Sequence, residues 1–294
     1  MDNENRFSAY AAFEKETPFD FSRYSSVGCG GNAEIAFTPR SVSELAALLR
    51  QLEKDGIEYY VLGNLTNVLP SDNGTERAVI RTKNLNGITV TGNGAFVYAG
   101  ATSGALLAAC RREKKSGVEF LNGVPCTLGG ALYMNAGAGG KYIGEIVENV
   151  FVYRNGETRF LSAAECGYEY KKSVFMENGD VILGASLRLD PAEEEEILTR
   201  ENYYAARRAH LPKGRSMGCV FKNPVGGYAG DLIERSGLKG MRIGGAKISE
   251  EHANFIINDQ KAKEKDIREL IALAKNAVRA QYGVILEEEI RYLT

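Results

Sequence analysis

The stretch "GVPCTLGGALYMNAGAGG" (residues 123–140) decides how this chain is interpreted, because it combines glycines with small polar residues. Two shorter segments, "GCGGNAE" (28–34) and "GNLTN" (63–67), have the same character. Backbone N–H groups bind a phosphate only where the chain approaches it closely, and glycines and small polar residues allow that approach. Taken alone, each segment can equally be a turn in a chain with 33 glycines. Three of them, two following predicted strands, indicate a ligand that carries a diphosphate.

None of these segments is a standard nucleotide-binding motif. No G-x-G-x-x-G fingerprint follows the first predicted strand. The P-loop pattern G-x-x-x-x-G-K-[ST] also fails, because Lys141 is followed by Tyr142 and Asn135 stands where the first glycine is required. The Rossmann and Walker A classes are therefore excluded for these segments.

The composition is that of a soluble, globular protein and not of a disordered chain. Hydrophobic residues make up 44% of the 294 residues and charged residues 25%. A net charge of −2 argues against a nucleic-acid-coating surface, and no apolar run approaches the roughly 20 residues of a membrane span. The first twenty residues are acidic and lack the basic start of a signal peptide. We therefore expect a cytoplasmic protein with no nucleic-acid or membrane partner; its oligomeric state is not indicated.

The cysteines are expected to be thiols rather than bridged or metal-bound. Five are present, an odd number with no C-x-x-C spacing, and only two histidines accompany them. No metal site is predicted. For Cys219, in the loop "RSMGCVFKNP" (215–224), two roles remain open: a small packed hydrophobe or a reacting group.

Helical and alternating patterns follow one another along the whole chain and predict an α+β fold. Ser41 and Glu44 are spaced as a capping box at the start of the first long helix, and Gly56 fits its end. Helices are expected at 41–56, 103–117, 191–211, 228–237 and 263–283. Strands are expected at 34–39, 57–63, 77–82, 95–100, 147–161 (a hairpin turning at Asn155-Gly156), 180–190, 241–248, 253–259 and 284–293.

Seven ordered segments resemble one family, the UDP-N-acetylenolpyruvoylglucosamine reductases (MurB), which are flavoenzymes of peptidoglycan synthesis. They are "YSSVGCGGNAE" (24–34), "LGNLTNVL" (62–69), "VEFLNGVPCTLGGALYMNAGAGG" (118–140), "YEYKKSVF" (168–175), "GCVFKNP" (218–224), "GLKGMRIGGAKISEEHANFIIN" (237–258) and "LEEEIRYL" (286–293). The short connection between "YKKSVF" and "DVILGASLRL" leaves no room for the tyrosine-bearing loop of the type I enzymes, so the chain resembles type II.

The resemblance implies a two-part FAD-binding fold of the vanillyl-alcohol oxidase type plus an α+β substrate-binding domain. The expected parts are FAD-binding subdomains at 1–75 and 76–190 and a substrate-binding domain at 191–294, whose last strand returns to the active site. The implied cofactor is FAD, with NADPH as hydride donor. The implied substrate is UDP-N-acetylglucosamine enolpyruvate, reduced to UDP-N-acetylmuramate.

The same resemblance assigns the site residues. It implies FAD contacts at Gly63, Asn64, Leu65, Thr66, Asn67, Pro125, Cys126, Thr127, Gly129, Gly130, Asn135, Ala136 and Gly137. It implies substrate contacts at Tyr170, Lys222, Asn223 and Arg291, and catalytic roles for Cys219, Glu289 and Lys171.

The implied reaction delivers a hydride to C3 of the enolpyruvyl ether and a proton to C2. Cys219 stands where the family has its proton-donating serine, and a thiol with a pKa of about 8.5 is mostly protonated at neutral pH. Glu289 matches the catalytic glutamate; strand alternation alone would not separate it from Glu287, which shares its face. His252 is expected to order its own segment rather than to transfer protons.

Three positions depart from the family pattern. Lys171 replaces an arginine, which keeps the charge but loses the bidentate fork. Leu65 and Cys126 replace glycines, and either would cost about 1–2 kcal/mol if its backbone needed a positive φ. These departures support a second hypothesis, an attenuated relative that binds flavin or UDP-sugar as a scaffold. A third, an oxidase on the related flavin fold, is opposed by the intact 218–224 and 242–255 segments.

Overall fold

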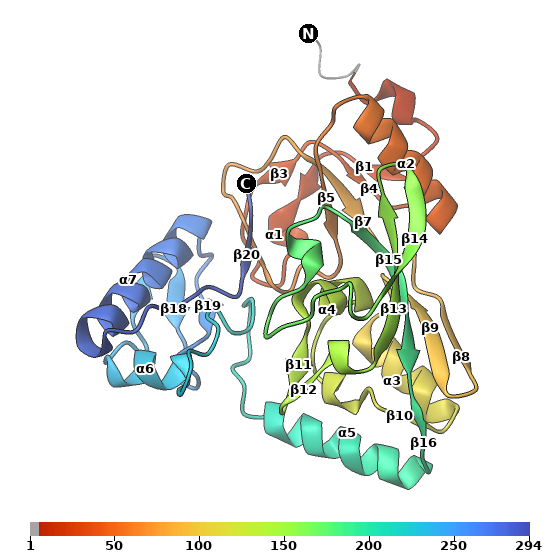
Figure 1. Ribbon diagram of the computed structural model, residues 1–294. Coiled ribbons are helices and arrows are strands. Elements are labelled where there is room, and N and C mark those ends of the chain that lie inside the picture. Colours follow the sequence, from red (N-terminus) through yellow and green to blue (C-terminus); the bar gives the residue numbers. More distant parts are fainter. Residues whose placement is uncertain (1–5) are drawn as a thin grey trace. The chain divides into compact units, whose positions relative to one another are not determined.

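The computed structural model describes residues 6–294, which form two compact units assembled from separate segments (Figure 1). The first unit contains the chain up to Pro18, Glu34–Gly63 and Arg77–Arg207. The second contains Phe19–Ala33, Asn64–Glu76 and Arg208–Thr294. The prediction that the chain has no signal peptide concerns the first twenty residues, of which residues 1–5 lie outside the described range. The three-part division at 1–75, 76–190 and 191–294 stays a prediction.

One layer of the first unit is a four-stranded sheet in the order β1-β4-β7-β5. Strands β4, β7 and β5 run parallel, and β1 is antiparallel to β4. Their bounds are β1 Lys15–Glu16, β4 Ala36–Phe37, β7 Ala78–Arg81 and β5 Tyr59–Leu62.

Helix α2 (Val42–Lys54) connects β4 to β5, as the sequence predicts. The Ser41 hydroxyl accepts the N–H of Glu44 at 3.1 Å, which is the expected N-cap. The second half of the capping box differs, because the Glu44 carboxylate accepts the N–H of Arg40 instead of that of Ser41. Gly56, at φ +66°, follows the helix end as expected.

The larger layer of the first unit is an antiparallel five-stranded sheet in the order β14-β13-β15-β9-β8. The predicted hairpin at Asn155-Gly156 is confirmed: Arg154 pairs with Glu157, and both turn residues have positive φ (50° and 88°). The strand bounds are β14 Glu157–Ser162, β13 Val147–Arg154, β15 Val181–Arg188, β9 Gly94–Tyr98 and β8 Ile88–Thr91.

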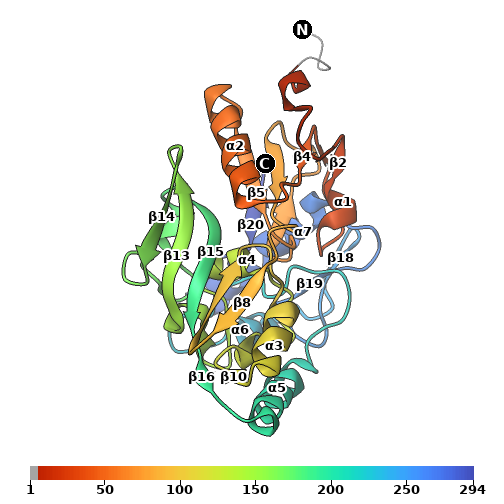
Figure 2. The same cartoon turned by 90° about the vertical axis from the view of Figure 1, so that its right-hand side faces the viewer.

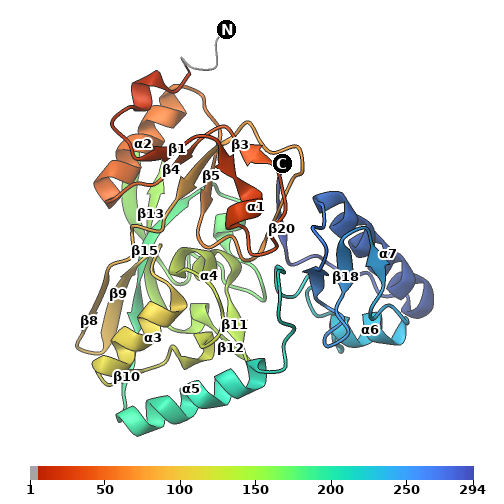
Figure 3. The same ribbon diagram turned by 180° about the vertical axis from the view of Figure 1, so that it is seen from behind.

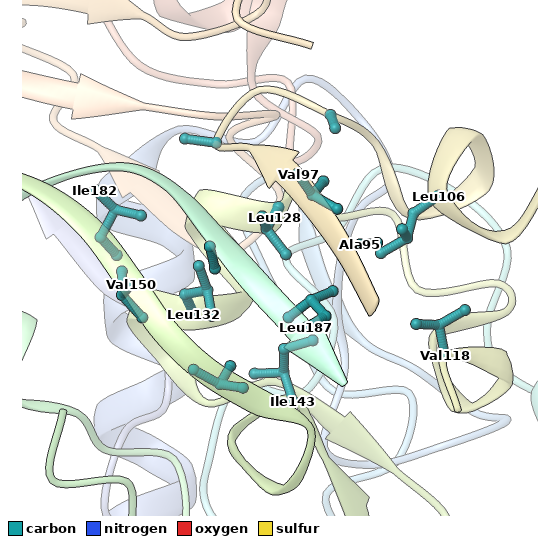
Figure 4. Close-up of a cluster of buried hydrophobic side chains, with 14 of the residues drawn as sticks. Ala95, Val97, Leu106, Val118, Leu128, Leu132, Ile143, Val150, Ile182 and Leu187 are labelled. Atoms are coloured by element: carbon teal, nitrogen blue, oxygen red, sulfur yellow. The ribbon is translucent and has the colours of Figure 1, made fainter. Parts of the chain in front are cut away.

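Helices α3 (Ser103–Arg112) and α4 (Leu128–Met134) lie on one side of this sheet, as Figure 2 shows. The core between them is apolar, and Figure 4 shows part of it: Val97, Val150, Ile182 and Leu187 from strands and Leu106, Leu128 and Leu132 from helices. Helix α5 (Glu194–Arg208) and two short strand pairings complete the unit; β10 (Lys115–Ser116) pairs with β16 (Asp190–Pro191), and β11 (Gly137–Ala138) with β12 (Lys141–Tyr142).

The second unit has its own core around helices α6 (Ala229–Arg235) and α7 (Glu264–Tyr282), which lie beside β18 in Figures 1 and 3. Its three-stranded antiparallel sheet is β17 (Arg242–Ile243), β18 (Ala246–Ile248) and β19 (Ile256–Asn258). The remaining elements are α1 (Phe21–Tyr24), the β2–β3 pair (Phe19–Asp20 with Asn32–Ala33) and the parallel β6–β20 pair (Val68–Pro70 with Arg291–Leu293).

Two strand predictions are wrong in extent. The strand expected at 284–293 is regular only over Arg291–Leu293, because the preceding residues make a single bridge, between Phe221 and Glu288. The strand expected at 241–248 is two short strands joined at Gly244, whose φ is +51°. Over residues 6–294 no helix has the length and hydrophobicity needed to span a bilayer.

Candidate active site

The predicted site residues are divided between the two units. The first unit holds Gly63, Pro125, Cys126, Thr127, Gly129, Gly130, Asn135, Ala136, Gly137, Tyr170 and Lys171. The second holds Asn64, Leu65, Thr66, Asn67, Cys219, Lys222, Asn223, Glu289 and Arg291. Each group is described within its own unit.

In the first unit, Gly63 of one predicted diphosphate-binding segment lies against Thr127 of another. A Cβ on Gly63 would be 2.2 Å from the Thr127 hydroxyl oxygen, so no other residue fits there without movement. Thr127 caps α4, accepting the N–H of Gly130 at 3.4 Å. Gly129 meets Ala99 in the same way, with a Cβ–Cβ distance of 3.1 Å if a side chain were added. Both contacts are made inside the protein, so close packing explains these two glycines. Backbone N–H groups in loops of such small residues are the donors that a diphosphate accepts, and in that respect the residues present fit the expected FAD.

Cys126 does not carry the strain considered from the sequence. Its φ lies outside the left-handed region, and its N–H donates to the carbonyl of Val124 at 2.8 Å. Its half-buried side chain packs against the core of the first unit, and Pro125 beside it is exposed. The replacement of glycine at this position therefore carries no backbone cost.

Asn135 ends helix α4 in the left-handed conformation, at φ 44°, and its buried amide is engaged by the protein. Its Nδ2 donates to the carbonyl of Glu169 at 2.8 Å, and its Oδ1 accepts the N–H of Gly144 at 3.0 Å. The backbones of the next two residues are also hydrogen-bonded within the protein: the N–H of Ala136 donates to the carbonyl of Ala131, and Gly137 pairs with Tyr142. The amide of Asn135 thus joins the segment at 135–137 to the segment that carries Lys171.

Lys171 lies in a tight turn. Glu169 and Lys172 exchange two backbone hydrogen bonds of 3.2 Å around Tyr170-Lys171, and Lys171 has φ +54°. A lysine in that conformation is uncommon, and strained residues of this kind gather at functional sites. Tyr170 is 43% exposed and its ring meets that of Tyr142 edge-on, with centroids 6.2 Å apart. The turn presents both residues at the surface of the first unit.

In the second unit, Leu65 does carry the strain. Its φ is +51°, and its side chain is buried, at 4% exposure. Its carbonyl accepts the N–H of Ser26 at 3.2 Å. Asn64 is exposed and Thr66 half-buried, and neither side chain bonds to another described residue, so both are available to a ligand.

Asn67 connects its loop to the C-terminal segment. Its Nδ2 donates to the carbonyl of Glu289 at 3.1 Å, and its carbonyl accepts the N–H of Arg291 at 2.9 Å. Glu289 in turn donates its N–H to the carbonyl of Val220 at 2.8 Å. Segments 64–67, 218–224 and 286–293, distant in the sequence, are therefore joined by backbone bonds in one unit.

The backbone of the Cys219 segment is held by Asn254, a residue that the sequence pattern does not single out. The buried amide of Asn254 accepts the N–H of Phe221 and donates to its carbonyl, both at 2.8 Å. Asn254 also donates its own N–H to Nδ1 of His252 at 3.2 Å, so His252 orders its own segment as expected. Burial lowers the pKa of His252. The signal was present in "EEHANF", but an asparagine there is not distinguishable from a turn residue.

The remaining acidic and substrate-assigned residues have local partners. Lys222 pairs with exposed Glu287 at 3.2 Å, and the Oδ1 of Asn223 accepts the N–H of Ala229 at the start of α6 at 3.1 Å. Burial alone would raise the pKa of Glu288, but hydrogen bonds from Lys275 (2.8 Å) and Tyr292 (2.5 Å) outweigh it and lower that pKa. Glu288 therefore has structural hydrogen-bond partners, and the catalytic role of Glu289 stays a prediction.

Two family models match the chain. The FAD binding domain matches residues 33–159, and the C-terminal domain of UDP-N-acetylenolpyruvoylglucosamine reductase matches residues 210–293. Between them they cover the 125–137 segment and the Cys219, Asn254 and Glu289 segments.

Curated relatives extend this likeness to nearly the whole chain. The UDP-N-acetylenolpyruvoylglucosamine reductase of Clostridioides difficile is 37% identical over 275 residues, covering 92% of this chain and 90% of its own. That of Alkaliphilus oremlandii is 34% identical over 301 residues and covers 98% of both. The crystal structure of the Thermus caldophilus reductase superimposes with a TM-score of 0.83 at 34% identity, over 96% of this chain and 99% of the other.

Proposed function

The chain belongs to the UDP-N-acetylenolpyruvoylglucosamine reductase family, and on that basis we propose that it reduces UDP-N-acetylglucosamine enolpyruvate to UDP-N-acetylmuramate with NADPH, in peptidoglycan synthesis. FAD, when bound, supplies the hydride-transfer chemistry between nicotinamide and substrate. We place the reaction in the cytoplasm, where NADPH is available.

One observation supports the catalytic assignment most directly. The N–H of Glu289 donates to the carbonyl of Val220 at 2.8 Å, so the segment carrying Glu289 runs beside the residue that follows Cys219. A proton donor and a carboxylate are thus held by adjacent backbones in the second unit. In the proposed reaction the Cys219 thiol gives its proton to C2 of the substrate as the hydride adds to C3.

The charged residues have complementary proposed roles. Lys171 stabilises the negative charge that develops on the enolpyruvyl carboxylate, as a point charge rather than a bidentate fork. Glu289 orients the enol ether. Tyr170, Lys222, Asn223 and Arg291 contact the nucleotide sugar; the Oδ1 of Asn223 also accepts the N–H of Ala229 at the start of α6.

The test is a substrate-dependent reduction assay. The purified protein should show a flavin absorption spectrum, and it should oxidise NADPH in proportion to added UDP-N-acetylglucosamine enolpyruvate, yielding UDP-N-acetylmuramate by mass spectrometry. A protein that takes up no added FAD, or a flavoprotein that oxidises NADPH at the same rate without the substrate, would exclude the proposal. The binding-only and oxidase alternatives are not favoured, because the likeness to reductases spans 92–98% of the chain.

A further inference from the structure

Ser26 lies where the second unit brings two site segments together. It follows α1 and precedes Val27, which is fully buried in the core of that unit. The peptide N–H of Ser26 donates to the carbonyl of Leu65 at 3.2 Å, and its hydroxyl donates to the carbonyl of Ser216 at 2.6 Å. The hydroxyl also lies 3.3 Å from Leu65 O, but its single proton goes to the shorter contact.

These two hydrogen bonds connect Ser26 to two segments with different proposed roles, FAD binding for loop 64–67 and proton transfer for the Cys219 segment. Leu65 belongs to loop 64–67, and its carbonyl is held in place although the residue has a left-handed backbone. Ser216 precedes Cys219 by three residues, and Gly218 between them turns the chain at φ +76°. A displacement of Ser216 is therefore transmitted to Cys219 over a short, bent stretch.

The hydroxyl of Ser26 is not what anchors its own segment. The carbonyls of Val27 and Gly28 both accept from the amide of Asn258, at 2.9 and 3.0 Å, and the Val27 side chain is in the core. The peptide bond from Ser26 to Leu65 also survives any side-chain change. Removing the hydroxyl therefore releases the Ser216 carbonyl and leaves the fold and loop 64–67 in place.

We propose that Ser26 is a positioning residue, whose hydroxyl sets the place of the Cys219 segment relative to loop 64–67. Within the proposed function, this makes Ser26 a determinant of the proton-transfer half of the reaction and not of flavin reduction. Small misplacements of a reacting group cost large factors in rate, which gives one hydroxyl a measurable kinetic effect.

The test compares Ser26→Ala with Ser25→Ala and Ser26→Thr in the flavin-loaded enzyme. Ser25 is a matched control because it is the neighbouring serine and, among residues 6–294, its hydroxyl bonds only within its own turn: it donates to the carbonyl of Cys29 and accepts the N–H of Gly28, both at 3.2 Å. Stopped-flow absorbance separates reduction by NADPH from reoxidation by UDP-N-acetylglucosamine enolpyruvate. Ser26→Ala should slow reoxidation about tenfold or more and leave reduction by NADPH unchanged, while Ser26→Thr and Ser25→Ala retain the wild-type reoxidation rate.

A second measurement does not depend on turnover. Iodoacetamide labelling, followed by peptide mass spectrometry, reports the exposure and placement of Cys219, with half-buried Cys126 of the other unit as internal reference. The other cysteines are slow, because burial raises the thiol pKa to about 12 for Cys29 and Cys110 and about 11 for Cys166. Ser26→Ala should change the Cys219-to-Cys126 labelling ratio by about twofold or more, and Ser25→Ala should not.

Three results would overturn the inference: equal slowing of both half-reactions, an unchanged reoxidation rate, or an unchanged labelling ratio in Ser26→Ala. If the wild type itself is not reoxidised by the substrate, the proposed function fails. The labelling ratio then still decides whether Ser26 positions Cys219.

Discussion

Replacing Asn254 with alanine should weaken the second unit and the Cys219 segment together. The Asn254 amide makes two 2.8 Å hydrogen bonds to the N–H and the carbonyl of Phe221. Asn254 is 3% exposed and Phe221 2%, so water cannot replace the lost partner. Leaving one buried polar group unpaired costs about 1–3 kcal/mol, and two such groups give an expected loss of about 2–6 kcal/mol in the free energy of unfolding.

Urea unfolding followed by circular dichroism measures this loss. Asn73→Ala is the matched control, because Asn73 belongs to the same unit but is exposed; it should change the free energy of unfolding by less than about 0.5 kcal/mol. In folded Asn254→Ala protein, reoxidation by the substrate should also be slower, since Phe221 lies two residues after Cys219. A loss below about 1 kcal/mol, or one equal to that of the control, would refute the reasoning about the Phe221 clamp.

Three further predictions follow from single side chains. Cys219→Ser should keep substrate-dependent reoxidation, whereas Cys219→Ala should slow it by about 100-fold or more with NADPH reduction intact; undiminished turnover in the alanine variant would assign Cys219 to packing. Leu65→Gly should be more stable to urea than Leu65→Ala, because both lose the buried side chain but only glycine relieves the φ of +51°; the reverse order would mean that Leu65 is unstrained. Asp266→Asn should lower the free energy of unfolding at neutral pH. It should also make the free energy of unfolding decrease less steeply as the pH is lowered. Burial would raise the pKa of Asp266, but hydrogen bonds from the N–H groups of Lys263 and Gly245 outweigh burial, so the pKa is lowered. Its contribution is therefore present above the unfolded pKa of about 3.9 and lost as pH falls through the lower folded value; parallel acid-unfolding curves for variant and wild type would contradict this.

The sequence predicts the regular elements well where a pattern spans several turns or residues. Helix α2 and the hairpin at Asn155-Gly156 follow from local rules, apolar spacing and the left-handed preference of the turn residues. The division into two units does not follow from local rules, because residues 19–33 and 64–76 leave their sequence neighbours and join the C-terminal third. No periodicity in a short loop records such a partner.

Backbone strain was equally hidden from the sequence. Two lost glycines, at positions 65 and 126, were equivalent candidates for a positive φ, and only Leu65 has one. The difference lies in what each loop contacts: Leu65 O is held by Ser26, whereas Cys126 sits in a turn closed onto Val124. The sequence pattern did not predict a positive φ at Lys171, because that conformation arises from the two-residue turn between Glu169 and Lys172.

The two asparagines assigned to FAD by motif position show what a motif leaves open. Asn67 and Asn135 belong to different units, yet each turns its amide to a backbone carbonyl of a segment with a proposed catalytic residue: Glu289 itself for Asn67, and Glu169, two residues before Lys171, for Asn135. The motif specifies an asparagine at each position, but it does not say which side-chain atoms make contacts or with what. In both units the geometry supports the same use, in which the loop expected to meet the cofactor also holds the segment expected to meet the substrate. Because an aliphatic residue cannot donate a hydrogen bond to a main-chain carbonyl, a side chain with a donor would be required at these positions even if neither asparagine touches FAD.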